Sequence, residues 1–362
     1  MRILHVITSL HIGGAERLMV DLLPLLMQSG NNDVELLLFD GTETPFYNEL
    51  KSKGVVIHCL TKGGNIYNPK LIIKLLGYVD QYDVIHTHNT ACQFFVPIAR
   101  AIKNSQTLLI TTEHNSTNRR RDKWWFKPLD RWMYRQYASI ICIADQTQKN
   151  LEQYIGSKKT ISTIYNGVDI RRFLKPVKDI SGQSRFVITM VAAFRKQKDH
   201  ETLLRAMTHL PDNFFLQFVG SGITEPLVKD KCRELGLNDR VIFMGARSDV
   251  SEIMEQSDII VLSSHWEGLS LSSIEGMASG RPFIASDVDG LHEMASGAGI
   301  LFPHGDDKEL AKQIQYLCEH PKEYQEVAQR CQKRAKKYDI SVMASNYLEL
   351  YQRITETQCS IV

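Results

Sequence analysis

The sequence predicts an α/β protein made of two doubly wound parallel-sheet domains. The chain has 362 residues, which is enough for two domains at about 150 residues each. Short β-rich runs alternate with helical patterns along it, which is typical of parallel α/β layers. The alternation restarts after a polar, glycine-containing stretch at 180–184, which we interpret as a linker or domain edge.

Each expected element follows from its local pattern. Strands are expected at short buried-type runs, and helices where apolar residues recur at helical spacing. In the first half the strands are expected at 2–8, 34–39, 55–59, 83–87, 107–112 and 140–144, with a first helix at 16–28. In the second half they are expected at 186–193, 214–219, 241–244, 259–262 and 282–285, with helices at 201–210, 251–256 and 272–278. A last helix is expected at 342–354, beyond the second sheet.

The position of polar residues after strands indicates where function lies. In doubly wound sheets, ligands bind outside the carboxyl ends of the strands. Two such domains leave a cleft between their strand ends. Residues that directly follow strands are therefore the candidates for chemistry.

Composition excludes several classes of protein. A formal net charge of +2 argues against a dedicated nucleic-acid binder. The seven cysteines are scattered without a C-x-x-C pair, so we expect free thiols in a reducing compartment rather than a zinc cluster or disulfide framework. No run of 18 apolar residues and no signal-peptide pattern occurs, so we expect a cytoplasmic protein.

The first candidate site is a glycine pair after the first strand. Gly13 and Gly14 immediately precede a helix. Adjacent glycines let backbone amides approach an anion, and the start of a helix favours negative charge. A plain tight turn is the alternative interpretation. The loop is not a G-x-G-x-x-G, which disfavours a dinucleotide dehydrogenase.

Three histidines lie near the ends of two later strands of the first domain. His86 and His88 share one strand face, and His114 closes the next strand. A carboxylate-supported zinc site is one possibility. We favour hydrogen bonding to a polar ligand, which needs only neutral imidazoles.

The second domain carries cations after its first strand. Arg195, Lys196 and Lys198 lie at a strand–helix junction, where they suit a diphosphate. A solvated basic loop is the alternative.

Acidic residues follow two later strands of the second domain. Glu267 and Glu275 flank a run of small residues, and their carboxylates can accept hydrogen bonds from sugar hydroxyls. Glu275 could otherwise be a helix-start acid that favours the dipole. Asp287 and Asp289 form a D-x-D that we interpret as loop acids near the sugar, with divalent-ion binding as the alternative.

In this order, the motifs resemble those of glycosyltransferase family 4, which has the GT-B fold. The similarity covers nearly the whole chain. It is carried by residues 13–16, 83–88, 165–169, 198–204, 219–222, 243–245, 267–275 and 280–282.

The resemblance implies a nucleotide-sugar donor and a role for each matching residue. The catalytic residues that we expect are His114 beside the transferred sugar, Arg195 and Lys198 on the leaving diphosphate, and Glu267 on the sugar hydroxyls. The donor-binding residues that we expect are Gly13, Gly14, His88, Gly220, Arg247, Val250, Leu269, Ser270 and Glu275. Of these, the glycine loop would contact the diphosphate, Glu275 the ribose and the backbone near 247–250 the base.

The resemblance also implies a UDP- or GDP-linked donor, retention of anomeric configuration and no cofactor or metal. The acceptor would be a glycan or lipid-linked glycan of a bacterial-type surface polysaccharide. We expect an acceptor-side domain at 1–172, completed by a crossover helix at 341–358, and a donor-binding domain at 173–340. One position departs from the family, because Ala193 stands where an arginine is usual, and Arg195 would replace it.

The segment 118–137 predicts a membrane contact. It holds seven cations against two acids, a net charge of +5, and three of the four tryptophans. Cations beside interfacial aromatic residues suit an anionic membrane surface. The alternative is an amphipathic helix whose aromatic residues belong to the core. We expect a peripheral enzyme on the cytoplasmic face of the membrane.

Two other functions remain open from the sequence. A GT-B-fold sugar-nucleotide epimerase would need no acceptor, and the paired glutamates Glu267 and Glu275 favour transfer over it. A non-catalytic subunit of a glycan assembly complex is left open by Ala193, although Lys198 and His114 are intact.

Overall fold

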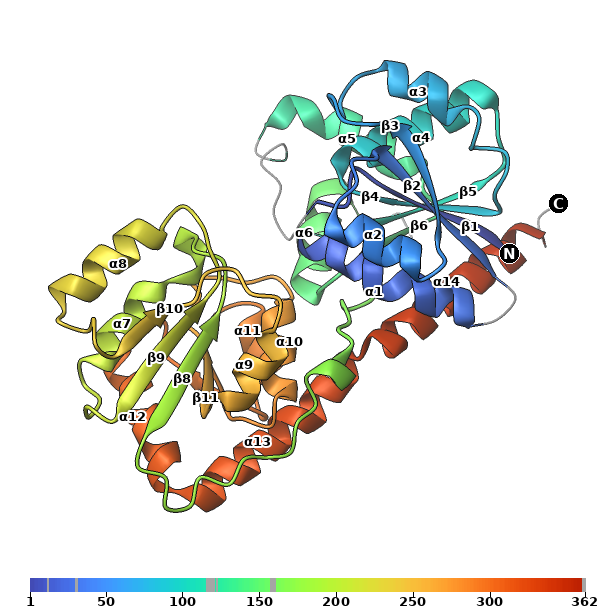
Figure 1. Cartoon of the computed structure of the whole chain (residues 1–362). Helices are drawn as coiled ribbons and strands as arrows, with labels where there is room; N and C mark the ends of the chain where they lie inside the picture. Colours follow the sequence, from blue (N-terminus) through green and yellow to red (C-terminus); the bar gives the residue numbers. More distant parts are fainter. Residues whose placement is uncertain (12, 30–31, 115–120, 122, 157–160, 360–362) are drawn as a thin grey trace. The chain divides into compact units, whose positions relative to one another are not determined.

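The computed structural model describes residues 1–11, 13–29, 32–114, 121, 123–156 and 161–359. The chain divides into two compact units (Figure 1). The first unit is Met1–Gly167 together with Ile340–Val362, and the second is Val168–Asp339.

The first unit is built on a parallel sheet of seven strands in the order β3-β2-β1-β4-β5-β6-β7. Its strands are β1 (Arg2–Ile7), β2 (Asp33–Asp40), β3 (Val56–Thr61), β4 (Val84–His88), β5 (Leu108–Glu113), β6 (Ser139–Cys142) and β7 (Ile161–Thr163). The chain order reverses between β1 and β4, so this is the switch point at which doubly wound sheets bind ligands.

Helices cover both faces of this sheet. They are α1 (Gly14–Gln28), α2 (Pro45–Ser52), α3 (Lys70–Leu75), α4 (Thr90–Lys103), α5 (Lys127–Arg135), α6 (Asp145–Ile155) and α14 (Ile340–Cys359). Ile3 and Ile7 of β1 pack in a core with α1 and α14, whereas Leu4 and Val6 pack in another with α3, α4 and α5. Burial on both faces explains why the strands are continuous apolar runs.

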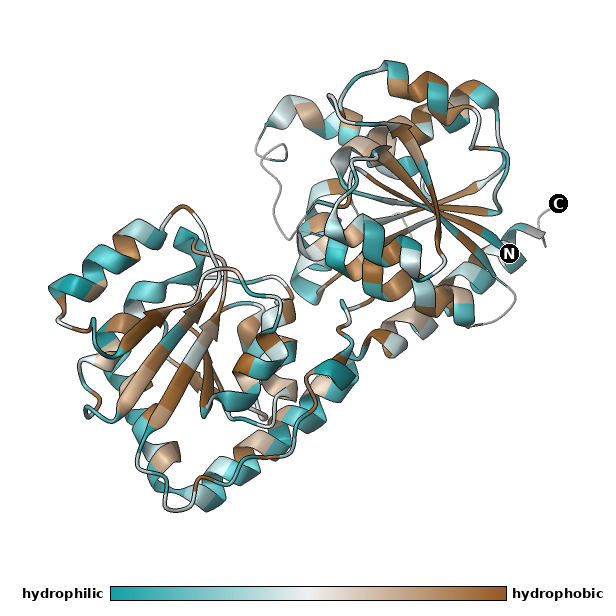
Figure 2. Ribbon diagram, in the orientation of Figure 1, coloured by the Kyte–Doolittle hydropathy of each residue, from teal (hydrophilic) through white to brown (hydrophobic). Residues whose placement is uncertain are grey.

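The second unit repeats this plan with six parallel strands in the order β10-β9-β8-β11-β12-β13. Its strands are β8 (Phe186–Val191), β9 (Phe214–Val219), β10 (Val241–Phe243), β11 (Ile259–Leu262), β12 (Phe283–Ser286) and β13 (Ile300–Phe302). Its helices are α7 (His200–Met207), α8 (Glu225–Glu234), α9 (Val250–Gln256), α10 (Leu271–Ala278), α11 (Leu291–Ala295), α12 (Asp307–Glu319) and α13 (Pro321–Ala335). The strands are apolar and the outer helix faces hydrophilic (Figure 2).

The stretch at 180–184 is not the boundary between the two units, so this expectation was wrong. Ile180 is buried in the core of the second unit. Val168 and Ile170 lie in the same core, and the Val168 N–H donates to the Tyr338 carbonyl at 3.0 Å. The second unit therefore begins at Val168, five residues before the expected position 173.

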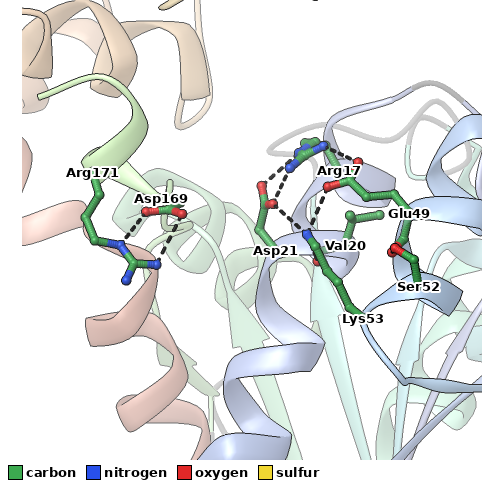
Figure 3. Close-up of polar contacts among 8 residues, drawn as sticks. All are labelled: Arg17, Val20, Asp21, Glu49, Ser52, Lys53, Asp169 and Arg171. Atoms are coloured by element: carbon green, nitrogen blue, oxygen red, sulfur yellow. Dashed lines mark hydrogen bonds and ion pairs between the residues drawn. The ribbon is translucent and has the colours of Figure 1, made fainter.

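Ion pairs on α1 and α2 fix the helix that follows the glycine pair (Figure 3). Arg17 bonds Asp21 on its own helix and donates to Glu49 of α2 at 2.8 Å. Lys53 then donates to Glu49 at 2.9 Å. In the second unit, the Arg171 side chain donates to Asp169 at 2.8 Å (Figure 3).

Candidate active site

The glycine pair lies at the switch point of the first sheet, after β1. Gly14 opens α1, and a side chain added there would meet no atom within 4 Å. Asn89, which follows β4, donates from its side chain to Thr8 at 3.0 Å and so ties the two strand ends together. At Gly13 an added Cβ would lie 2.2 Å from Glu16 Oε2, so a carboxylate of α1 itself lies over the start of this helix.

His88 is fully buried at the end of β4, and both of its ring nitrogens are engaged. Its Nδ1 lies 2.9 Å from His114 Nε2, and its Nε2 lies 3.1 Å from His5 Nδ1. The prediction that His88 itself binds the donor therefore needs correction, because His88 has no ring nitrogen left for a ligand. Its Nδ1 contacts His114, which is partly exposed beyond β5.

His86 is also hydrogen-bonded at both ring nitrogens. Its Nδ1 lies 2.6 Å from the Tyr351 hydroxyl and its Nε2 lies 2.7 Å from Thr112 Oγ1. His5, His86 and His88 could offer a metal three nitrogens within 4.8 Å of one another. The rings of His86 and His88 are stacked at 4.4 Å, an arrangement that does not aim their lone pairs at one point. Hydrogen bonding explains the cluster better than zinc does.

In the second unit, Lys198 and Glu267 form an ion pair beside the switch point between β8 and β11. Lys198 Nζ lies 2.5 Å from Glu267 Oε1, which also accepts from Ser264 Oγ at 2.6 Å. Both side chains are largely buried. The structure thus brings together the predicted diphosphate cation and the predicted sugar-binding acid.

Arg195 is exposed on the loop that follows β8, and so is Ala193. This loop packs against the loop after β9 through Gly220, whose φ is +146°. A Cβ at Gly220 would lie 2.0 Å from the Ala192 carbonyl oxygen, so only glycine fits this approach.

The loop that contains Glu267 packs against the loop that carries Asp287 and Asp289. The Glu267 N–H donates to the Asp289 carbonyl at 3.2 Å. A Cβ at Gly290, whose φ is +82°, would collide with the carbonyls of Glu267 and Gly268. Asp287 meanwhile lies 2.5 Å from His292 Nδ1, and the hydrogen bond raises the pKa of that histidine.

The remaining predicted donor contacts lie at the starts of two helices. Ser270 is buried at the N-terminus of α10, with Leu269 before it, and Glu275 is partly buried one turn farther along that helix. Arg247 is exposed, and its side chain is paired with Asp249 at 2.8 Å, just before Val250 opens α9.

A second group that could hold a metal was not predicted from the sequence. Asp199, His265 and His304 place one ligand atom each within 4.8 Å of one another, and Asp199 directly follows Lys198 in the chain. Asp199 already caps α7, since its Oδ1 accepts from the Thr202 backbone N–H at 3.3 Å. His265 and His304 share a 2.6 Å contact.

The segment 118–137, predicted to contact a membrane, lies partly outside the described residues. The structure describes Arg121 and residues 123–137 of it. Arg121 is not a surface cation: its Nη2 lies 2.7 Å from Glu113 Oε2, and only 9% of its side chain is exposed. Trp124 is 81% exposed and Trp125 57% exposed, whereas Met133 and Tyr137 are buried. In the part of the chain that the structure describes, no helix combines the length and the apolar character needed to cross a membrane.

Two family models together cover nearly all of the chain. The glycosyltransferase family 4 model matches residues 12–172, and the model for glycosyl transferases group 1 matches residues 173–338. The chain belongs to glycosyltransferase family 4. It is therefore a glycosyltransferase with two Rossmann-like units, and the family favours transfer over the epimerase and the non-catalytic subunit.

Two curated relatives match parts of the chain. The UDP-Gal:alpha-D-GlcNAc-diphosphoundecaprenol alpha-1,3-galactosyltransferase of Escherichia coli is 29% identical over 58% of this chain and 59% of the relative. The N,N'-diacetylbacillosaminyl-diphospho-undecaprenol alpha-1,3-N-acetylgalactosaminyltransferase of Campylobacter jejuni is 30% identical over 49% of this chain and 47% of its own. The match thus spans about half to three-fifths of these relatives.

Solved structures share the fold along the whole chain. Anabaena HepE in complex with UDP-glucose has a TM-score of 0.81 at 22% identity, covering 99% of this chain and 100% of its own. A glycosyltransferase from Rickettsia africae has a TM-score of 0.81 at 20% identity, covering 98% of each chain.

Proposed function

We propose that this glycosyltransferase moves a sugar, with retention, from a UDP- or GDP-linked donor to a hydroxyl of a lipid-linked glycan. The observation that carries the proposal is the buried Lys198–Glu267 pair at the switch point of the second sheet. It offers a cation for a leaving diphosphate and a carboxylate for sugar hydroxyls within one site.

The proposed chemistry depends on charge that develops as the nucleoside diphosphate leaves. Lys198 and the exposed Arg195 would stabilise the negative charge on the β-phosphate. Groups aimed at developing charge bind the transition state better than the ground state. His114 would orient the sugar while its anomeric carbon becomes positive.

We assign the remaining donor contacts by the same logic. Glu275 would hold the ribose, and the backbone from Arg247 to Val250 would receive the base. Leu269, Ser270 and Gly220 would line the diphosphate side of the site. Retention with no protein nucleophile implies that the acceptor hydroxyl attacks on the face from which the diphosphate departs.

Protein cations would fill the role that a divalent ion has in other transferases. Activity should then survive excess EDTA. Loss of activity that Mn²⁺ or Mg²⁺ restores would overturn this part of the proposal and would direct attention to Asp199, His265 and His304, or to Asp287 and Asp289.

The acceptor is proposed to be lipid-linked because of the surface near 123–135 and the names of both curated relatives, which include a diphosphoundecaprenol acceptor. Lys123, Trp124, Trp125 and Arg131 are exposed on this surface. It would hold the enzyme at an anionic membrane.

Donor identity is tested by thermal shift with UDP-, GDP- and ADP-sugars. A ligand that binds the folded state at 100 times its Kd stabilises it by about 2.7 kcal/mol. We expect stabilisation by UDP- or GDP-sugars that is reduced in Glu275→Ala. No stabilisation by any nucleotide-sugar would contradict the proposal.

A further inference from the structure

A line of hydrogen-bonded side chains runs through the first unit from His114 to α14. We call His114, His88, His5, Tyr351 and His86 the histidine array. His114 Nε2 lies 2.9 Å from His88 Nδ1, and His88 Nε2 lies 3.1 Å from His5 Nδ1. The Tyr351 hydroxyl lies 3.4 Å from His5 Nε2 and 2.6 Å from His86 Nδ1, and so joins these two histidines. The two outermost histidines are joined through β1 and the last helix.

Every histidine of the array is held neutral. Burial lowers the pKa of His5 to about 3 and that of His114 to about 4, and it lowers the pKa of His86 and His88 well below the usual value. A neutral imidazole has one N–H and one lone pair, so each ring donates at one nitrogen and accepts at the other. Burial also raises the pKa of Tyr351, which keeps its proton.

The direction of one link therefore sets the direction of all the others. If Tyr351 donates to His86, then His5 must donate its Nε2–H to the Tyr351 oxygen. His5 Nδ1 then accepts from His88 Nε2–H, and His88 Nδ1 accepts from His114 Nε2–H. This leaves His114 with a lone pair at Nδ1. The opposite direction leaves His114 with an N–H at Nδ1.

The two contacts of the Tyr351 hydroxyl favour one of these directions. Hydrogen bonds donated by O–H are shorter than those donated by N–H. The contact with His86 Nδ1 is 2.6 Å and that with His5 Nε2 is 3.4 Å. The shorter contact favours donation from the hydroxyl to His86 Nδ1. In that direction His86 would carry its N–H at Nε2, and Thr112 Oγ1, which lies 2.7 Å away, would accept from it.

We propose that His88, His5 and Tyr351 are positioning residues that fix His114 in its Nε2–H tautomer, so that Nδ1 accepts a hydrogen bond from a hydroxyl of the donor sugar. The sugar contact rests on the proposed function, whereas the tautomer does not. A nitrogen that accepts a hydrogen bond from a sugar hydroxyl discriminates against sugars without that hydroxyl, because the nitrogen is then left without a hydrogen-bond partner.

The tautomer is measured directly by long-range ¹H–¹⁵N spectra of the full chain labelled with ¹⁵N-histidine. These spectra separate protonated from unprotonated ring nitrogens, and His114→Asn assigns the His114 signals among the twelve histidines. We expect His114 to be protonated at Nε2, and Tyr351→Phe to give a mixture of tautomers. A His114 protonated at Nδ1, an unchanged tautomer in Tyr351→Phe, or a stoichiometric metal on the histidines would overturn the proposal.

Tyr347→Phe is the matched control. Tyr347 lies one turn before Tyr351 on α14 and is equally buried, but its hydroxyl contacts Thr112 Oγ1 at 3.2 Å and reaches the array only through that threonine. The loss of one hydroxyl from the helix is therefore the same in both variants. We expect the His114 tautomer of Tyr347→Phe to match that of the wild type.

Kinetics test whether the tautomer matters for transfer. Tyr351→Phe should lower kcat/KM for the donor by about two- to tenfold, the effect of one neutral hydrogen bond. In a His114→Asn background it should have no further effect, because an amide has no tautomer to fix. Equal losses in both backgrounds would indicate general structural damage and would contradict the proposal. If His114→Asn alone leaves turnover unchanged, the sugar-binding role of His114 fails while the spectra still test the array.

Discussion

Lys198 Nζ lies 2.5 Å from Glu267 Oε1, and the two charges compensate each other in a largely buried site. An unpaired charge in such a place is costly, so each residue needs the other when no ligand is present. In the proposed reaction, a diphosphate would replace Glu267 as the partner of Lys198 and release the carboxylate toward sugar hydroxyls. The ion pair thus neutralises both charges when no ligand is bound.

Lys198→Ala should lower kcat by about 10²–10³-fold while it changes the donor KM much less. The cation matters most when the leaving group carries its charge. Lys178→Ala is the matched control, since Lys178 Nζ lies 2.6 Å from the buried Asp258 in the same unit, and we expect a loss of stability but not of kcat. Steady-state kinetics with a thermal-melting check on both variants would decide. A raised KM with unchanged kcat would show that Lys198 contributes only to ground-state binding.

Arg195→Ala should also lower kcat, because Arg195 would replace the family arginine that is absent at Ala193. Arg195 is exposed, so the variant should keep its melting temperature. Lys196→Ala removes the neighbouring exposed cation and should leave kcat nearly unchanged. If both variants turn over like the wild type, this loop is only a solvated basic loop.

The first unit should lose stability as the pH falls below about 6.5. The histidines of the array are neutral when folded, with pKa values near 3 for His5 and 4 for His114, so the unfolded chain binds more protons. Each of them contributes a loss of about 1.4 kcal/mol per pH unit between its unfolded and folded pKa. Urea denaturation between about pH 7.5 and 5 measures this slope. His292→Asn, which removes an exposed histidine of raised pKa, should leave the slope in place, and a flat profile in the wild type would show that the array is charged.

Binding to anionic vesicles should depend on the exposed surface near Trp124. Lys123→Ser with Arg131→Ser should reduce co-sedimentation, and added salt should weaken it. Arg121 is unsuitable for this test because it is paired with Glu113. Lys308→Ser with Lys322→Ser removes the same charge from exposed positions of the second unit and serves as control. A wild-type protein that ignores anionic vesicles at low salt would refute the membrane contact.

Much of the fold could be predicted because buried parallel strands are continuous apolar runs. The strands at 214–219 and 259–262 were predicted at their observed bounds. The edge strands β7 and β13 were missed, whereas β10, an edge strand of the same three-residue length, was predicted. The boundary at 180–184 was misplaced because Ile180, inside a polar stretch, is buried by residues distant in sequence.

The positions of the candidate residues after strands could be predicted, but not the pairs that their side chains form. Strand ends located His114, Lys198 and Glu267. The histidine array could not be foreseen, because His86 and Tyr351 are 265 residues apart and meet only when α14 packs on the first unit. The spacing of Tyr347 and Tyr351 on one face of the last helix was the one local signal.

The transfer reaction itself tests the central claim most directly. Purified full-length protein is incubated with a UDP- or GDP-sugar and a polyprenyl-diphosphate-linked sugar acceptor, and the product is analysed by mass spectrometry and by NMR of its anomeric proton. We predict a product longer by one sugar whose anomeric configuration matches that of the donor, formed only when the acceptor is present. A new nucleotide-sugar formed without acceptor, or a product of inverted configuration, would contradict this account.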